Sequence, residues 1–218
     1  LPLDKKFNPD FAIPGKKPVG GVEIDWSNPI TRGLKTYLHL NDKGTTARNL
    51  VDGSVRTIGG STYVWEVDGW KQTTSSTTSS NIPFFTATDE GSLVLRYTPS
   101  SLYNFNSIFD TDSDPNDFEG WIYSDGRLHV KRAQADSRPE ITGVSAGDYL
   151  KLGFSWKRGE TGSGNKLYLD GTLRDETTSD GTSVTGQVYL NSGNTGNTGG
   201  IGKYDFAMQF DRRLTDAE

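Results

Sequence analysis

Acidic side chains crowd into one short stretch of this chain, and closely spaced carboxylates can hold a cation. The stretch contains no Lys or Arg, and its aspartates are Asp110, Asp112, Asp114 and Asp117. Carboxylates this close repel one another unless a cation gathers them, and Ca²⁺ prefers several such oxygens. An EF-hand is excluded, because Pro115 and Trp121 occupy the positions that need glycine and a bidentate glutamate. An irregular calcium loop and a solvated acidic loop both stay open.

Aromatic side chains near the expected loops could do a second kind of chemistry. Exposed aromatic rings stack on sugar rings, and large exposed apolar groups mark binding surfaces. The aromatic residues placed in this way are Trp70, Tyr103, Trp121 and Tyr123. The competing interpretation is that the same rings fill the interface with a second sheet.

The chain has only two histidines, His39 and His129, and no cysteine. Each histidine falls within an alternating stretch and has no Cys, nor an obvious Ser partner, so the case for a metal or a nucleophile is weak. We expect both to be outward-facing strand residues.

The elements that would position these side chains are strands. Residues 150–156 alternate strictly, with Leu150, Leu152, Phe154 and Trp156 on one side, which is typical of a half-buried strand. After a polar loop, Leu167 and Leu169 belong to a second strand. Asp170-Gly171 then offers the two positive-φ positions of a tight hairpin turn.

The same alternation recurs along the chain. A second hairpin is expected over 118–132, with its turn at Asp125-Gly126. Further inward residues are Leu34, Leu38, Leu40, Tyr63, Trp65, Leu93, Leu95, Tyr97, Leu128, Val130, Val188, Leu190, Phe206, Met208 and Phe210. Strands every 8–15 residues without an amphipathic helix predict an all-β protein, a two-layer antiparallel β-sandwich.

The stretch "YLKLGFSWKRGETGSGNKLYLDGTLRDETT" resembles the central hairpin of laminin-G-like domains, which belong to the concanavalin A-like lectin/glucanase superfamily. The ending "GGIGKYDFAMQFDRRLTDAE" is similar to the closing strand of that family, and "EIDWSNPITRGLKTYLHLND" resembles the opening of laminin-G-like proteins of tailed bacteriophages. The resemblance implies a jelly-roll topology, and a calcium ion at the sandwich rim is frequent in such domains.

The glucanase relatives also raise an enzymatic interpretation, because their catalytic strand carries three alternating acids. Glu23 and Asp25 begin this pattern, and Glu66 and Asp68 nearly do so, but the third acid is missing in both. Retaining hydrolysis needs two carboxyls about 5–5.5 Å apart, and residues two apart on a strand come near that spacing. Glu23, however, ends a proline-rich arm, a poor place for a preorganised nucleophile. We therefore expect no enzymatic activity.

The net charge and the apolar content of the chain argue against two classes of partner, nucleic acids and membranes. A net charge of −5 argues against a nucleic-acid surface, and no apolar run approaches the length of a membrane span. No signal peptide is recognised at the start. We expect no nucleic-acid or membrane partner.

The first 22 residues form a distinct segment with four of the nine prolines, so an extended arm is expected. Its apolar and basic residues suit attachment to a neighbour or, alternatively, to its own sandwich; they are Phe7, Phe11, Ile13, Lys16, Lys17 and Val19.

Together these observations predict an arm over 1–22 and a concanavalin A/laminin-G-like sandwich over 23–218. The function expected first is a non-enzymatic bacteriophage virion protein, a capsid decoration or tail-associated component. It would attach to other virion proteins, sibling subunits in a homo-oligomer, or surface glycans, on the extracellular virion surface. The alternative is a carbohydrate-binding lectin-like module, with calcium as its only candidate cofactor.

Overall fold

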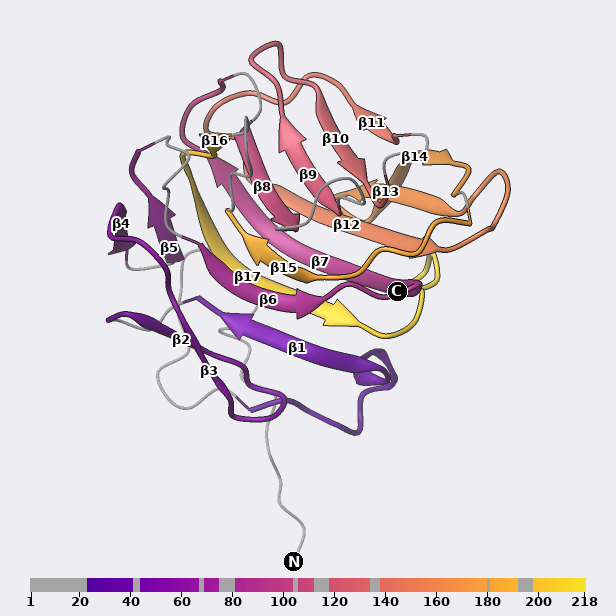
Figure 1. The fold of residues 1–218 in the computed structure, drawn as a ribbon, viewed down its shortest axis with the longest axis horizontal. Helices are drawn as coiled ribbons and strands as arrows, with labels where there is room; N and C mark the ends of the chain where they lie inside the picture. The colour runs from indigo at the N-terminus through magenta and orange to yellow at the C-terminus, as the bar shows by residue number, and fades with distance from the viewer. Residues whose placement is uncertain are drawn as a thin grey trace, which may run out of the picture.

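The computed structural model describes residues 23–40, 44–66, 69–74, 81–103, 106–111, 118–133, 138–179, 181–191 and 198–218. Two antiparallel sheets lie face to face in this part of the chain, and the one helix described is the 3₁₀ turn η2 (Pro29–Thr31). No helix of the described residues is long and apolar enough to cross a membrane. The all-β sandwich predicted from the alternation is confirmed (Figure 1).

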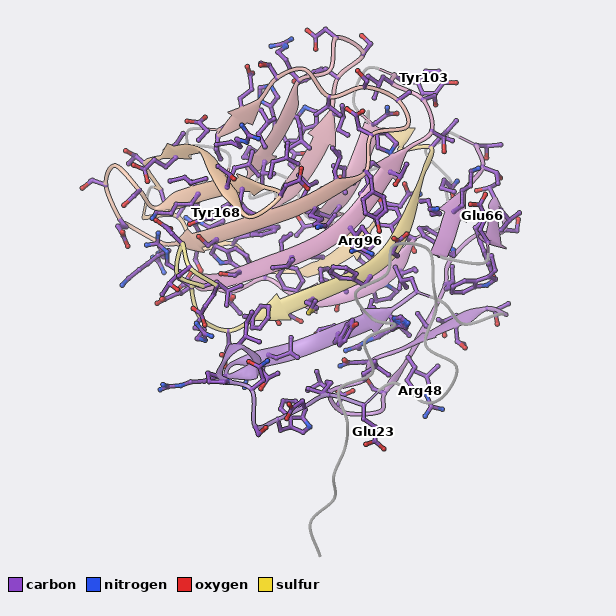
Figure 2. All side chains as sticks on the ribbon, turned by 180° about the vertical axis from the view of Figure 1, so that it is seen from behind. Glu23, Arg48, Glu66, Arg96, Tyr103 and Tyr168 are labelled. Carbon is purple, nitrogen blue, oxygen red and sulfur yellow. The ribbon has the colours of Figure 1, made fainter. Side chains whose placement is uncertain are left out.

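The larger sheet has eight strands and is seen from its outer side in Figure 2. Strand β17 lies inside it, paired with β7, β5 and β1. The strands of the larger sheet follow one another in the order β14 (Thr172–Thr177), β13 (Asn165–Leu169), β12 (Leu150–Lys157), β7 (Glu90–Pro99), β17 (Gly202–Phe210), β5 (Gly69–Gln72) and β4 (Tyr63–Glu66), and β1 (Leu34–His39) also pairs with β17.

The smaller sheet has seven strands and faces the viewer in Figure 1. Its order is β11 (Glu140–Ile141), β10 (Leu128–Lys131), β9 (Glu119–Ile122), β8 (Asn106–Thr111), β15 (Gln187–Leu190) and β6 (Ile82–Thr86), with β16 (Thr198–Gly199) parallel to β8. A separate two-stranded ribbon pairs β2 (Thr46–Arg48) with β3 (Val55–Thr57).

The core fills the space between the two sheets, and Trp156 lies at its centre. Trp156 is fully buried, as predicted, and its ring contacts Phe154 of its own strand together with Phe85 and Phe118 from the opposite side. Its indole nitrogen donates to the Thr88 carbonyl at 2.8 Å, so the one polar atom of the ring is satisfied. The same residue therefore links both layers.

The two predicted hairpin turns are confirmed. Asp170 and Gly171 have φ values of 52° and 76°, the pair of left-handed residues that a two-residue turn between β13 and β14 requires. Gly126 has φ 80° in the turn between β9 and β10.

In the last core strand, the alternation between buried and exposed residues is shifted by one position from the prediction. Phe206 and Met208 were expected to be inward, but both are only partly buried, while Tyr204 and Ala207 are fully buried. A register irregularity between Tyr204 and Phe206 adds one residue to β17 opposite β7. A β-bulge of this kind moves the following side chains to the other face, which the alternation of the sequence alone does not reveal.

Candidate functional site

A row of polar and aromatic side chains crosses the outer face of the smaller sheet. The strand register places Ser107 of β8 opposite Trp121 of β9, Trp121 opposite His129 of β10, and His129 opposite Glu140 of β11. Neighbouring positions such as Ile122, Leu128 and Val130 point into the core, so by alternation these four point away from it. We call Ser107, Trp121, His129 and Glu140 the outer row.

The outer row is buried even though it lies on the outer face. Ser107, Trp121 and His129 are 2%, 3% and 9% exposed. Within the described part of the chain, Ser107 Oγ, Trp121 Nε1 and His129 Nδ1 have no hydrogen-bond partner. His129 Nε2 makes no hydrogen bond of good geometry either, although it lies 2.7 Å from Glu140 Oε2. A buried polar group left without a partner costs about 1–3 kcal/mol, so native folds rarely tolerate several side by side. Three such atoms on adjacent strands make the outer row a candidate binding site.

The Trp121 ring is held on a stack of neighbours. The His129 imidazole lies parallel to it, with ring centroids 5.6 Å apart and planes at 11°. The guanidinium of Arg138 lies over the same ring, 5.3 Å from its centroid. The half-buried Tyr123 completes the cluster edge-on, with its ring centroid 6.1 Å from Trp121 and 5.0 Å from His129. The rings are therefore fixed before any ligand arrives.

The carboxylates around the outer row are paired with cations or with histidine. Glu119 Oε1 lies 2.6 Å from Lys131 Nζ, and both side chains are nearly buried. Glu140 Oε2 lies 2.7 Å from His129 Nε2. Arg127 hydrogen-bonds to Asp125 at 2.7 Å, which holds the pKa of that carboxyl below its ordinary value.

The imidazole of His129 is neutral at neutral pH. Its burial lowers its pKa below the ordinary 6.5, although the Glu140 carboxylate acts in the opposite direction. The adjacent carboxylate favours a proton on Nε2, which leaves Nδ1 as an acceptor. The outer row thus offers an indole donor, a hydroxyl and an imidazole acceptor, a set that suits a ligand rich in hydroxyl groups.

The aromatic residues singled out from the sequence separate into three environments. Trp121 and Tyr123 come together with His129, but Trp121 is buried rather than exposed, which corrects that part of the prediction. Trp70 is fully buried in the core against Tyr204, with centroids 5.5 Å apart, so it cannot stack on a sugar at the surface. Tyr103 is 46% exposed after β7.

The acidic stretch is described only at its first residue. Asp110 lies on β8 opposite Tyr189 and is 1% exposed, so it is a buried strand residue rather than part of a solvated loop. Asp112, Asp114 and Asp117 lie outside the described residues, as do the arm residues 1–22. No group of three or more potential metal ligands occurs among the described residues. Calcium binding therefore stays a prediction.

Sequence reasoning missed Ser107, Lys131, Arg138 and Glu140. Part of the signal was present, because the Asp125-Gly126 turn fixes which residues of its hairpin face each other. Counting back from a two-residue turn there, however, places Trp121 opposite Val130; its actual partner is His129, because three residues lie in the loop between Tyr123 and Arg127. Ser107 and Glu140 depend on the pairing of strands across longer connections, which no local pattern reveals.

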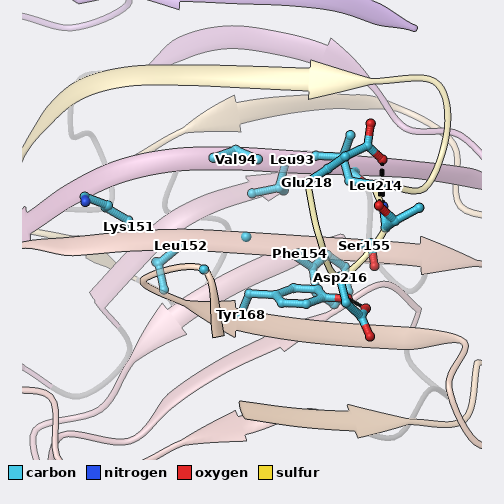
Figure 3. A pocket seen from close by; sticks show the side chains of 14 residues that line it. Leu93, Val94, Lys151, Leu152, Phe154, Ser155, Tyr168, Leu214, Asp216 and Glu218 are labelled. Carbon is cyan, nitrogen blue, oxygen red and sulfur yellow. Dashed lines mark hydrogen bonds between the residues drawn. The ribbon is translucent and has the colours of Figure 1, made fainter. Parts of the chain in front are cut away.

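A second feature lies on the outer face of the larger sheet, where Figure 2 labels Arg96 and Tyr168. A hollow of about 200 Å³ opens there between β7, β12 and the C-terminal residues. Figure 3 shows Tyr168 and Asp216 on one side of it and Leu93 and Val94 on the other. Its rim carboxylates are paired, because Asp216 contacts Lys166 and the Tyr168 hydroxyl, and Glu218 contacts Arg212. The hollow is mostly apolar, and among its lining residues Ser155 alone has a buried polar atom without a hydrogen-bond partner.

The comparison with family models gives no match for this sequence, and the comparison with curated proteins gives none either. Solved structures do match. A Trypanosoma rangeli sialidase mutant with trans-sialidase activity shares 11% identity at a TM-score of 0.67, covering 86% of this chain and 32% of the sialidase. The chain thus spans about a third of the length of that enzyme.

Two further structures have the same fold. Domain 4 of an extracellular GH43 arabinanase from Geobacillus stearothermophilus, solved with arabinotriose, shares 17% identity at a TM-score of 0.61, covering 84% of this chain and 95% of that domain. The third structure is of botulinum neurotoxin type C, a toxin whose cell entry depends on interaction with two ganglioside molecules. It shares 10% identity at a TM-score of 0.61, and the match covers 85% of this chain and 49% of the neurotoxin chain. At these identities the likeness shows the fold alone, a β-sandwich consistent with a jelly roll.

Proposed function

We propose that this chain is a glycan-binding module without catalytic activity, and that the outer row is its binding site. The observation that carries the proposal is the set of three buried polar atoms without partners on Ser107, Trp121 and His129. Sugars satisfy such atoms well, because each hydroxyl can both donate and accept a hydrogen bond.

Each residue has a defined part in this proposal. Trp121 Nε1 donates to a sugar oxygen, His129 Nδ1 accepts from a sugar hydroxyl, and Ser107 Oγ does either. The half-buried ring of Tyr123 offers an apolar surface to the C–H face of a sugar. Because the rings are already packed against one another, little side-chain entropy is lost on binding.

The comparisons support a binding role more than an enzymatic one. The arabinanase domain was solved with an oligosaccharide, and it is nearly the same size as the matched region here. The sialidases are far longer than this chain, so their activity is not transferred to it. The absence of catalysis stays a prediction.

A glycan array followed by titration calorimetry tests the proposal. The Trp121→Phe variant keeps a ring in the stack but removes Nε1, and Ser107→Ala removes the hydroxyl. Each variant should weaken binding about 3- to 10-fold, the value of one lost neutral hydrogen bond. Trp26→Phe is the matched control, because Trp26 is 57% exposed and lies before η2, far along the chain from the outer row.

Thermal melts of each variant confirm that the fold is retained. Unchanged affinity in both site variants would move the binding surface away from the outer row. An array without any glycan bound, in the presence and absence of calcium, would refute the proposed function.

The virion role remains a separate prediction. It rests on the resemblance to phage-encoded proteins and on the apolar residues of the arm, which lie outside the described residues. None of the structures named above is a phage protein. The virion role and the glycan-binding role are compatible, because attachment of a virion protein was predicted to use either neighbouring subunits or surface glycans.

A further inference from the structure

We infer that the outer row recognises a sugar acid, a glycan unit that carries a carboxylate, and that Arg138 binds that carboxylate without a metal ion. This inference rests on the proposed function and names the substrate class of the same site.

The first step is the balance of charge around the outer row. The carboxylates of Glu119 and Glu140, which lie at this row, each have a cation or a histidine beside them. Glu119 is engaged by Lys131 at 2.6 Å, and Glu140 lies 2.7 Å from His129 and 3.8 Å from Arg127. The site therefore does not present an unpaired negative charge from these residues to an incoming ligand.

The second step is Arg138, the cation next to this site that lacks such a partner. Arg138 is exposed, and it has no hydrogen bond or ion pair with another residue within the described part of the chain. Its guanidinium lies over the Trp121 ring, which restrains the group through a cation–π contact. A guanidinium that lies face-on to an aromatic ring keeps its N–H groups at the edge, where they can bind a planar anion.

The third step is the match between this edge and a carboxylate. A guanidinium edge and a carboxylate form two parallel hydrogen bonds, a geometry that favours one carboxylate over a diffuse polyanion. Trp121 Nε1 and Ser107 Oγ lie in the same row and add uncharged donors. The net charge of −5 disfavours long polyanions through the field of the whole protein, so recognition must be local.

The experiment uses matched pairs of oligosaccharides on the full chain. One member of each pair contains a hexuronic or a sialic acid, and the other is the same glycan with its carboxyl reduced to an alcohol. Binding is measured by calorimetry with a chelator present. We expect the acid form to bind about 10- to 100-fold more tightly, the range for hydrogen bonds to a charged group. Comparison of the hexuronic acid with the sialic acid shows which kind of sugar acid supplies the carboxylate.

Two substitutions assign the effect. Arg138→Gln should abolish the preference, so that the acid form and the reduced form bind this variant equally. Arg48→Gln removes the same charge from an exposed position on β2 and should preserve the preference.

The other possible results contradict either this inference or the proposed function. Equal binding of both members of a pair overturns this inference and leaves the proposed function standing. A preference that survives in Arg138→Gln, or equally tight binding of sulfated chains, shows general charge attraction and also overturns it. Binding of the acid form that disappears with the chelator contradicts the metal-free carboxylate contact. Failure of every glycan refutes the proposed function itself.

Discussion

His129 illustrates how neighbours determine the role of a single residue. From the sequence it is an isolated histidine on a strand, with nothing to distinguish it from a surface residue. In the structure it stacks on Trp121, contacts Glu140 and is 9% exposed. Burial therefore outweighs the nearby carboxylate and keeps the ring neutral.

This environment predicts a pH dependence of stability. The unfolded chain binds a proton at His129 near pH 6.5, whereas the folded chain does so only at lower pH. Between those two values the unfolded state carries more protons, so the free energy of unfolding falls as the pH falls. Urea melts at pH 7.5, 6.5 and 5.5 should show this loss in the wild type and a smaller loss in His129→Gln. Parallel curves for the two proteins would contradict a lowered pKa.

At the scale of elements, the two hairpin turns look alike in the sequence but differ in their surroundings. Gly171 and Gly126 have φ values of 76° and 80°. A Cβ added at Gly171 meets nothing within 4 Å, whereas one added at Gly126 lies 2.4 Å from the Val144 carbonyl oxygen. Only the second turn is packed against another backbone segment.

Alanine substitutions should separate these two effects. Gly171→Ala should cost about 1–2 kcal/mol, the strain of a left-handed non-glycine residue. Gly126→Ala carries the same strain and in addition must displace backbone atoms, so its cost should be clearly larger. Chemical denaturation of both variants measures the difference. Equal losses would mean that the Val144 segment yields without resistance.

The elements were predictable to the extent that their signals are local. The strict alternation of β12 and the Asp170-Gly171 dipeptide each identify a structure within about ten residues, and both are confirmed. The bulge in β17 was not predictable, because one extra residue changes the face without changing the composition. The outer row was less predictable. The hairpin that carries Trp121 and His129 was expected, but its three-residue loop shifts their register by one residue from that of a two-residue turn. Ser107 and Glu140 pair with these strands across longer connections.

At the scale of the whole molecule, stability depends on contacts that join the two sheets. Trp156 belongs to the larger sheet, and its ring stacks on Phe85 of β6 in the smaller sheet with centroids 5.9 Å apart. Phe118, which immediately precedes β9, packs edge-on against it at 4.7 Å. Its removal therefore opens the centre of the sandwich rather than one layer.

Trp156→Ala should lower the free energy of unfolding by about 3–5 kcal/mol, as large aromatic deletions do in packed cores. Trp26→Ala should change it by no more than about 0.5 kcal/mol, because that ring is 57% exposed. Urea melts followed by far-UV circular dichroism compare the two variants. A loss below about 1 kcal/mol for Trp156→Ala would mean that the two layers do not depend on this ring.

The place of β17 has a consequence for the order in which the protein can form during synthesis. This strand comes last along the chain, yet β7, β5 and β1 all pair with it. Until residues 202–210 leave the ribosome, β1 has no strand of this sheet to pair with and β7 lacks one neighbour. The nascent chain therefore holds open strand edges until β17 emerges, and such edges are exposed to wrong pairing in the meantime. Completion of the larger sheet must wait for its final strand.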